Sequence, residues 1–140
     1  MKILLAVDGS AYTKKMLAFL ATHLEWFADT TDFTVLTVKP TLPSRARAAV
    51  GKEAVDAYYA EESAKVLDPV LKYLGRHGLQ AKGVSKIGNA GDTIAQLAKS
   101  GKFDLVVMGS RGHGALTGLV MGSVATRVLA HCEVPVLLVR

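Results

Sequence analysis

Short apolar runs alternate along this chain with segments in which apolar residues recur at helical spacing. The expected strands cover 3–7, 33–38, 79–87, 105–108 and 136–139, and runs such as ILLAV and VLLV contain no polar residue. Continuous apolar runs are typical of parallel strands that helices cover on both faces. The alternation therefore predicts an α/β fold: one doubly wound, five-stranded parallel sheet with right-handed crossovers and helices on both faces.

The segments between these strands predict four helices. Their apolar stripes are Leu17, Leu20, Ala21 and Leu24; Val55 to Leu74; Ile94, Leu97 and Ala98; and Val124, Val128 and Leu129. We expect Pro69 to kink or divide the second and longest helix, because a proline removes a helical hydrogen bond. Residues 39–52 include Pro40, Pro43 and Gly51, and we expect them to form a mobile loop.

The composition fits one compact domain over residues 1–140. Half of the residues are hydrophobic (50%), which excludes a disordered chain. Cys132 is the single cysteine, so no internal disulfide can form; we expect a reducing, cytoplasmic location and a small, buried side chain. No run approaches the ~18 apolar residues of a membrane span, and the first run ends at Asp8, too early for a signal peptide.

The charge is modest, with 17 basic and 12 acidic residues and a formal net charge of +5. A basic protein invites a nucleic-acid partner, but these charges form no helical stripe and do not alternate with aromatic residues. We therefore expect a mixed surface and no nucleic-acid partner. The one local excess is a window without any acid, followed at once by an acidic run: Lys39, Arg45, Arg47 and Lys52, then Glu53, Asp56, Glu61 and Glu62.

Glycine is concentrated after the fourth expected strand, with six glycines between Gly101 and Gly122. In a doubly wound sheet, ligands lie beyond the carboxyl ends of the strands, where the strand order reverses. Glycines at such a place allow positive φ and let a ligand approach backbone N–H groups. Gly122 and Ser123 open the next helix, whose first N–H groups favour an anion, and Ser123 either caps that helix or binds phosphate. Arg111 adds a cation, so the segment predicts a phosphate site.

The alternative is a glycine loop that makes ordinary turns and binds nothing. Two known phosphate-binding patterns do not fit. Gly118 falls one residue late for the dinucleotide pattern, which also belongs after a first strand. The Walker pattern needs Ser or Thr after Gly-Lys, whereas Glu53 and Phe103 follow the two Gly-Lys pairs.

A third pattern does fit. Gly109-x2-Gly112-x9-Gly122-Ser123 resembles the nucleotide signature G-x2-G-x9-G-(S/T) of the universal stress protein family. The segments KILLAVDGS, FDLVVMGSRGHG and GSVATRVLAHCEVPVLLVR are similar to that family as well, so the resemblance spans the chain. It implies a Rossmann-like fold, close to the adenine nucleotide alpha hydrolases.

The resemblance to the ATP-binding branch implies a role for nine residues. It places Gly109, Arg111, Gly112, Gly122 and Ser123 on the phosphates, with a backbone N–H from Val124, and it places Asp8, Val38 and Met108 on the rest of the nucleotide. Asp8 is alternatively a turn former and helix cap, and Val38 and Met108 are alternatively core. The expected ligand is ATP with Mg or Mn, and AMP or cyclic AMP stay open because glycine spacing does not choose phosphate number.

The resemblance favours a nucleotide-binding module that acts in regulation or the stress response. The alternative is a slow ATPase or autophosphorylating enzyme, although no catalytic residue or metal ligand can be assigned. His113 either contacts phosphate or faces solvent, and His23, His77 and His131 lack metal-ligand spacing. A receiver domain is excluded, because it needs an acidic pair after the first strand and a phosphorylatable aspartate after the third.

The last strand predicts a partner. Residues 134–140 are strongly apolar and are expected at the edge of the sheet, where unpaired strands tend to associate. Members of the family commonly dimerise through their last strands, so we expect a homodimer.

Overall fold

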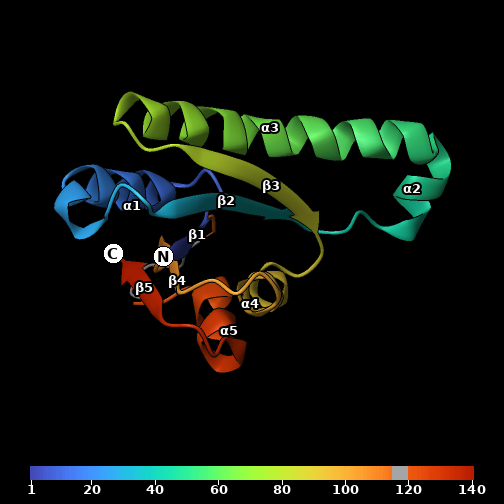
Figure 1. Cartoon of the computed structure of the whole chain (residues 1–140). Helices are drawn as coiled ribbons and strands as arrows, with labels where there is room; N and C mark the ends of the chain where they lie inside the picture. Colours follow the sequence, from blue (N-terminus) through green and yellow to red (C-terminus); the bar gives the residue numbers. More distant parts are fainter. Residues whose placement is uncertain (115–119) are drawn as a thin grey trace.

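The computed structural model describes residues 1–114 and 120–140, so Gly118 lies outside the described residues. Its strands are β1 (Lys2–Ala6), β2 (Asp32–Lys39), β3 (Ala81–Ile87), β4 (Leu105–Gly109) and β5 (Val136–Val139). They form one parallel sheet in the order β3-β2-β1-β4-β5 (Figure 1). The predicted five-stranded, doubly wound parallel sheet is confirmed.

Helices cover both faces of this sheet. α1 (Ala11–Ala21) and α3 (Lys52–Arg76) pack on one face, and α4 (Ala90–Ser100) and α5 (Ser123–His131) pack on the other. The side chains of β1 alternate between the two layers: Ile3 and Leu5 face the first, and Leu4 and Ala6 face the second. Because β1 is covered on both sides, its continuous apolar run has a direct structural cause.

Three features differ from the sequence-based expectation. α3 runs through Pro69 as one helix of 25 residues and is not divided there. Residues 44–50 of the expected mobile loop form α2 (Ser44–Val50), because alanine and arginine favour the helix and Gly51, at φ +85°, separates it from α3. α1 ends at Ala21, so Leu24 begins a separate 3₁₀ turn, η1 (Leu24–Trp26).

Two smaller expectations also change. β3 begins at Ala81, because Leu79 lies in the turn that closes α3, where its N–H donates to the carbonyl of Leu74 at 2.9 Å. Cys132 is half-buried after α5, with its thiol 3.5 Å from the carbonyl oxygen of Val134. Among the described residues, none of the helices has both the length and the apolar character that a bilayer crossing requires.

The strand order places a crevice beside β1. The chain proceeds from β1 outward to β3 on one side, then returns to the other side of β1 for β4 and β5. The connections that follow β1 and β4 therefore diverge to opposite faces of the sheet at its carboxyl edge. A ligand site is expected there from topology alone.

Truncation of the central strand tests how far the fold depends on it. Leu5 is fully buried, so Leu5→Ala leaves a cavity and is expected to lower the free energy of unfolding by about 2–5 kcal/mol. Leu129→Ala is the matched control, because Leu129 is 45% exposed on α5 and its loss should cost less than about 1 kcal/mol. Urea unfolding measures both. Equal losses would contradict this account of the core.

Candidate functional site

A cavity of about 430 Å³ lies at the carboxyl edge of the sheet, in the crevice that the topology predicts. All nine residues singled out from the sequence line it: Asp8, Val38, Met108, Gly109, Arg111, Gly112, Gly122, Ser123 and Val124. They come from β2, β4, α5 and the connections that follow β1 and β4, and the fold brings them together. Their role in binding stays a prediction.

The sequence analysis missed several other lining residues. Ala6, Val7, Thr13, Leu36, Ala90, Ile94, Gly114 and Ala125 also line the cavity, as does His113. Ala6, Leu36 and Ile94 had been assigned to strands and a helix only as core. The signal that could have found them is position: each lies near the carboxyl end of a strand or in the first turns of a helix that follows one.

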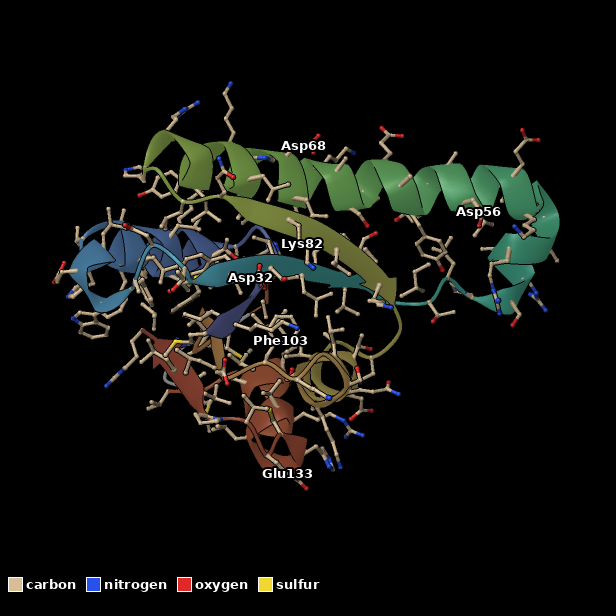
Figure 2. The ribbon with its side chains drawn as sticks, in the orientation of Figure 1. Asp32, Asp56, Asp68, Lys82, Phe103 and Glu133 are labelled. Atoms are coloured by element: carbon tan, nitrogen blue, oxygen red, sulfur yellow. The ribbon has the colours of Figure 1, made fainter. Side chains whose placement is uncertain are left out.

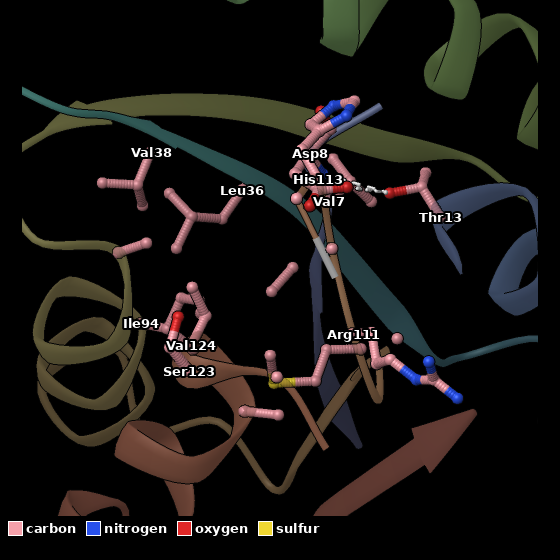
Figure 3. Close-up of a pocket in the computed structure, with 18 residues that line it drawn as sticks. Val7, Asp8, Thr13, Leu36, Val38, Ile94, Arg111, His113, Ser123 and Val124 are labelled. Atoms are coloured by element: carbon pink, nitrogen blue, oxygen red, sulfur yellow. Dashed lines mark hydrogen bonds between the residues drawn. The ribbon is translucent and has the colours of Figure 1, made fainter. Parts of the chain in front are cut away.

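The cavity has an apolar end and a polar end (Figure 3). Leu36, Val38 and Ile94 lie together on one side, and Asp8 and His113 lie across the cavity from them. Met108 belongs both to this site and to the core, because it lines the cavity and is only 5% exposed. Such a division suits a ligand with one apolar ring and one charged tail.

Asp8 holds the turn that connects β1 to α1. Its Oδ1 accepts hydrogen bonds from the N–H of Ser10 at 2.9 Å and from the hydroxyl of Thr13 at 3.0 Å. The Thr13 hydroxyl oxygen in turn accepts from the N–H groups of Asp8 and Gly9 at 3.1 and 3.2 Å. The turn-forming role is thus confirmed, but the helix cap is Ser10, whose side chain accepts from the N–H of Tyr12.

These contacts keep the Asp8 carboxylate charged. Burial disfavours the charged form and works to raise the pKa of Asp8. Hydrogen bonds from Ser10 and Thr13 outweigh burial, with a smaller contribution from the charge of His113, so the pKa of Asp8 lies below its ordinary value. The cavity therefore carries a negative charge at neutral pH, and Oδ2 of that carboxylate faces the glycine connection.

The three signature glycines are packed closely against the protein itself. A β-carbon on Gly112 would collide with Oδ2 of Asp8, and one on Gly109 would lie 2.7 Å from the β-carbon of Tyr12. A β-carbon on Gly122 would lie 3.2 Å from the α-carbon of Arg111. Positive φ, which the sequence analysis offered as one reason for glycine, occurs in this segment at Gly114 (φ +71°) and not at these three.

The first turn of α5 presents free backbone donors to the cavity. Gly122 is the N-cap, and the first intrahelical bond runs from the N–H of Thr126 to its carbonyl at 3.0 Å. The N–H groups of Ser123, Val124 and Ala125 thus precede the hydrogen-bonded part of the helix, and all three residues line the cavity. Ser123 does not cap the helix, because Gly122 holds that position, and its use toward a ligand stays a prediction.

The side chains of Arg111 and His113 both contact other groups of the protein. The Arg111 guanidinium lies 5.4 Å from the centre of the Tyr12 ring and points away from the cavity (Figure 3). Nε2 of His113 lies 2.8 Å from the carbonyl oxygen of Asp8. Because a carbonyl only accepts, Nε2 carries the proton and links the glycine connection to the turn after β1.

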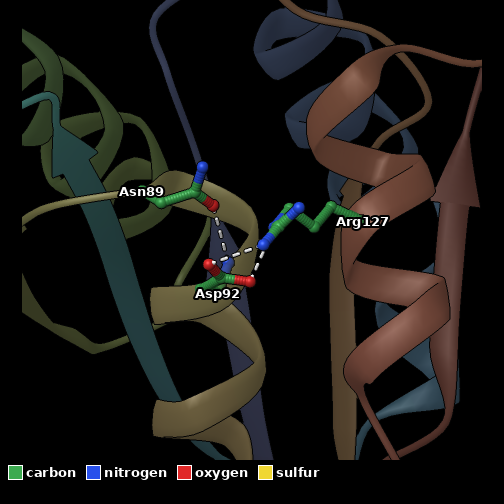
Figure 4. A network of polar contacts seen from close by, with 3 residues as sticks. All are labelled: Asn89, Asp92 and Arg127. Carbon is green, nitrogen blue, oxygen red and sulfur yellow. Dashed lines mark hydrogen bonds and ion pairs between the residues drawn. The ribbon is translucent and has the colours of Figure 1, made fainter.

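An ion pair ties α4 to α5 beside the cavity (Figure 4). Nε and Nη2 of Arg127 donate to the two carboxylate oxygens of Asp92 at 2.7 and 3.1 Å, and the side chain of Asn89 caps α4 by accepting from the N–H of Asp92. Gly91 permits this close approach, since its β-carbon would lie 2.7 Å from that of Arg127. The first turns of both helices are thereby held side by side.

The described residues contain no cluster of three or more His, Cys, Asp or Glu side chains that could hold a metal ion by themselves. One free carboxylate oxygen, Oδ2 of Asp8, faces the cavity. Mg²⁺ is commonly held by one or two carboxylates together with phosphate oxygens of a substrate. The site therefore fits a divalent cation that arrives with a phosphorylated ligand.

A model of the universal stress protein family matches residues 1–140 of this chain. The chain is similar to the universal stress protein Slr1230 of Synechocystis, with 31% identity over 99% of this chain and 42% of that protein. It is also similar to Sll1388 of the same organism, with 28% identity over 99% and 97% of the two chains. The chain thus spans less than half of one relative and nearly all of another.

Solved structures show the same fold. That of MJ0577 from Methanocaldococcus jannaschii has a TM-score of 0.82 and 23% identity, covering 99% of this chain and 94% of that one. A universal stress protein from Archaeoglobus fulgidus in complex with dAMP has a TM-score of 0.70 and 20% identity over 100% and 98% of the chains. A family protein from Arabidopsis thaliana with AMP bound has a TM-score of 0.69 and 18% identity over 99% and 90%.

The turn at Asp8 predicts how stability depends on pH. Because its pKa is lower in the folded chain, the Asp8 carboxylate stabilises the fold above its unfolded pKa of about 3.9, and this contribution is lost as pH falls through the folded value. Asp8→Asn keeps the shape but does not titrate. Urea unfolding over decreasing pH should therefore show a steeper loss for the wild type, with Thr13→Val between the two. Parallel profiles would contradict the account.

Proposed function

The chain belongs to the universal stress protein family, and from this premise we propose that it is a regulatory module of the stress response that binds ATP. The observation that carries the proposal is the cavity at the carboxyl edge, which joins an apolar end to a row of free backbone N–H groups. Relatives of the same fold bind AMP and dAMP, which supports an adenine nucleotide as the ligand class.

The adenine is assigned to the apolar end. Val38, Leu36, Ile94 and Met108 offer aliphatic and thioether contacts to a flat ring. Val38 lies one residue before the end of β2, where a backbone group at the sheet edge is available to read the edge of the base. A flat, uncharged ring at this end of the cavity would meet mainly carbon atoms of these side chains.

The phosphates are assigned to the first turn of α5, which Figure 3 shows beside Ile94 and across the cavity from Asp8. The N–H groups of Ser123 and Val124 at the start of α5, with the Ser123 hydroxyl, supply donors and the positive end of a helix dipole. Gly109, Gly112 and Gly122 keep the surrounding backbone free of side chains. Arg111 would reach a phosphate only by leaving the Tyr12 ring, so we assign it a smaller share of the binding free energy than the backbone donors.

The Asp8 carboxylate is assigned to the ribose or to a divalent cation. Its Oδ1 is used by the turn, so Oδ2 is the atom that would accept from a ribose hydroxyl or bind Mg²⁺ or Mn²⁺. A bound cation would neutralise phosphate charge next to this carboxylate. The chain's own part is to hold that oxygen charged and fixed in place.

We propose binding, and not turnover, as the primary activity of a single cytoplasmic domain over residues 1–140. Phosphoryl transfer needs a positioned nucleophile and a group that orients it. Asp8, the charged acid that lines the cavity, is already engaged by Ser10 and Thr13. Slow hydrolysis or autophosphorylation is the alternative, and a turnover assay with the purified protein separates the two.

A homodimer through β5 is part of the proposal. β5 ends the sheet, and the carbonyls of Pro135 and Val139 accept from β4, so the alternate residues Val136 and Leu138 direct their N–H and C=O groups outward. The opposite edge, β3, carries exposed lysines, Lys82 and Lys86, of the kind that prevent strand pairing. The apolar β5 edge is therefore the better candidate for a second copy.

The nucleotide proposal is tested by a bulky residue at the N-cap of α5. Gly122→Val places its side chain against the backbone of Arg111 and is expected to weaken ATP binding by at least about tenfold in titration calorimetry. Gly75→Val is the matched control, because its β-carbon meets nothing within 4 Å. AMP and cyclic AMP are titrated in parallel to rank the ligands. Equal ATP affinity of wild type and Gly122→Val, or no binding by wild type, would refute the site.

The dimer proposal is tested by sedimentation velocity. Leu138→Pro removes an outward N–H from β5 without touching the bonds to β4, so the variant is expected to lose the β5 contact and to sediment as a smaller species than the wild type. A circular dichroism melt checks that the variant is folded. A wild type that stays monomeric at micromolar concentration would overturn the proposal.

A further inference from the structure

The most uneven distribution of charge in the sequence lies outside the cavity proposed to bind the nucleotide. Four basic residues in the window 39–52 are followed by four acidic residues in 53–62. We call residues 44–62 the arm; it comprises α2, Gly51 and the first part of α3, from Lys52 to Glu62. None of the residues of the arm lines the cavity at the carboxyl edge.

The arm extends away from the rest of the fold. α2 lies at the outer end of α3, beyond the carboxyl ends of β2 and β3 (Figure 1). Sixteen of the nineteen arm residues are exposed, including all seven of α2. A helix of seven residues that buries none of its side chains is marginal by itself, because helices of this length gain most of their stability from packing. A surface that covers α2 would therefore stabilise it.

Each block of charge also carries one exposed apolar side chain. Val50 is 60% exposed and Tyr58 is 46% exposed, and Ala54 and Ala57 are exposed between them. The sign of the charge reverses between Lys52 and Glu53: Val50 follows Arg47 in the basic block, and Tyr58 precedes Glu61 in the acidic block. In an antiparallel pairing of two copies, each basic block would face an acidic block and Val50 would face Tyr58, as a self-complementary, two-fold interface requires.

We propose that the arm is a self-association surface whose occupant is a second copy of this chain in antiparallel, two-fold orientation. The basic α2 of one copy faces the acidic start of α3 of the other, and Val50 and Tyr58 pack near the axis. A different, acidic partner would use only the basic block of the arm, whereas a second copy uses the basic block, the acidic block and the side chains of Val50 and Tyr58.

The existing ion pairs leave the basic half available. Lys52 pairs with Asp56 at 2.8 Å, and Lys65 pairs with Glu62 at 3.0 Å, within α3 (Figure 2 labels Asp56). Among the described residues, neither Arg45 nor Arg47 has a carboxylate within ion-pair distance. Arginine is the cation best suited to bind carboxylates across an interface.

The size of the arm predicts a weak and reversible contact. Its sixteen exposed residues are fewer than the roughly 20–30 residues that each partner contributes to a standard interface. Its charges are exposed, so salt should weaken the contact strongly. The arm is also separate from β5, so the loss of one proposed contact leaves the other possible.

Charge reversal with cross-complementation tests the proposal. Two double variants reverse the charges: Arg45→Glu/Arg47→Glu and Glu61→Lys/Glu62→Lys. Each is expected to weaken self-association by about tenfold or more, and an equimolar mixture of the two should restore it by pairing unlike copies. Lys72→Glu/Arg76→Glu, at the other end of α3, changes the charge as much as the first variant and should associate like wild type. Sedimentation over a range of concentrations, at low and high salt, gives the affinities.

Site-specific crosslinking separates the arm from the β5 edge. In a Cys132→Ser background, Ala54→Cys lies near the proposed axis and should form a disulfide between copies on mild oxidation, whereas Lys72→Cys should not. High salt should suppress the first crosslink, and Leu138→Pro should not. The proposal is overturned if Ala54→Cys and Lys72→Cys crosslink equally, or if the mixture of charge-reversed variants fails to associate better than either alone.

Discussion

The burial of β1 on both faces is the constraint on which the rest of the structure depends. Its side chains must be apolar on both sides, so no polar group of the strand itself can face a ligand. Chemistry becomes possible only where β1 ends, at Val7 and Asp8, and the reversal of strand order beside β1 leaves space there. The central strand thus fixes both the core and the position of the cavity.

The site is built from groups that the fold also needs. Asp8 closes the turn into α1 with one carboxylate oxygen and faces the glycine connection with the other. Tyr12 and Asp8 leave no room for a β-carbon on Gly109 and Gly112, and the Arg111 backbone makes one on Gly122 a tight contact. The spacing of these glycines therefore reflects how the connection after β4 packs on β1 and α1, and the proposed phosphate site lies next to that packing.

Much of this arrangement could be predicted because its physical signals are local. The alternation of strand-like and helix-like segments predicted all five strands, the glycine spacing located the connection after β4, and the resemblance to the family singled out nine residues that the fold brings to one edge. The misjudged features depend on tertiary context. Helix propensity in residues 44–50 outweighed the flanking prolines, and α3 continues through Pro69. The Arg111 side chain packs over the Tyr12 ring, a contact that the spacing of the two residues in the sequence does not predict.

The glycine signature is explained by the packing of the fold and does not by itself require a ligand. A chain that kept these glycines only for packing would still show the signature, because a β-carbon on each of them would come close to a neighbouring protein atom. Ser123 and Val124 are different: both are exposed, neither belongs to the core, and the N-cap of α5 is Gly122 and not Ser123. Because packing does not explain these two residues, the exposed first turn of α5 is where contacts to the proposed ligand would decide the choice of nucleotide, whereas Val38 also packs against the core.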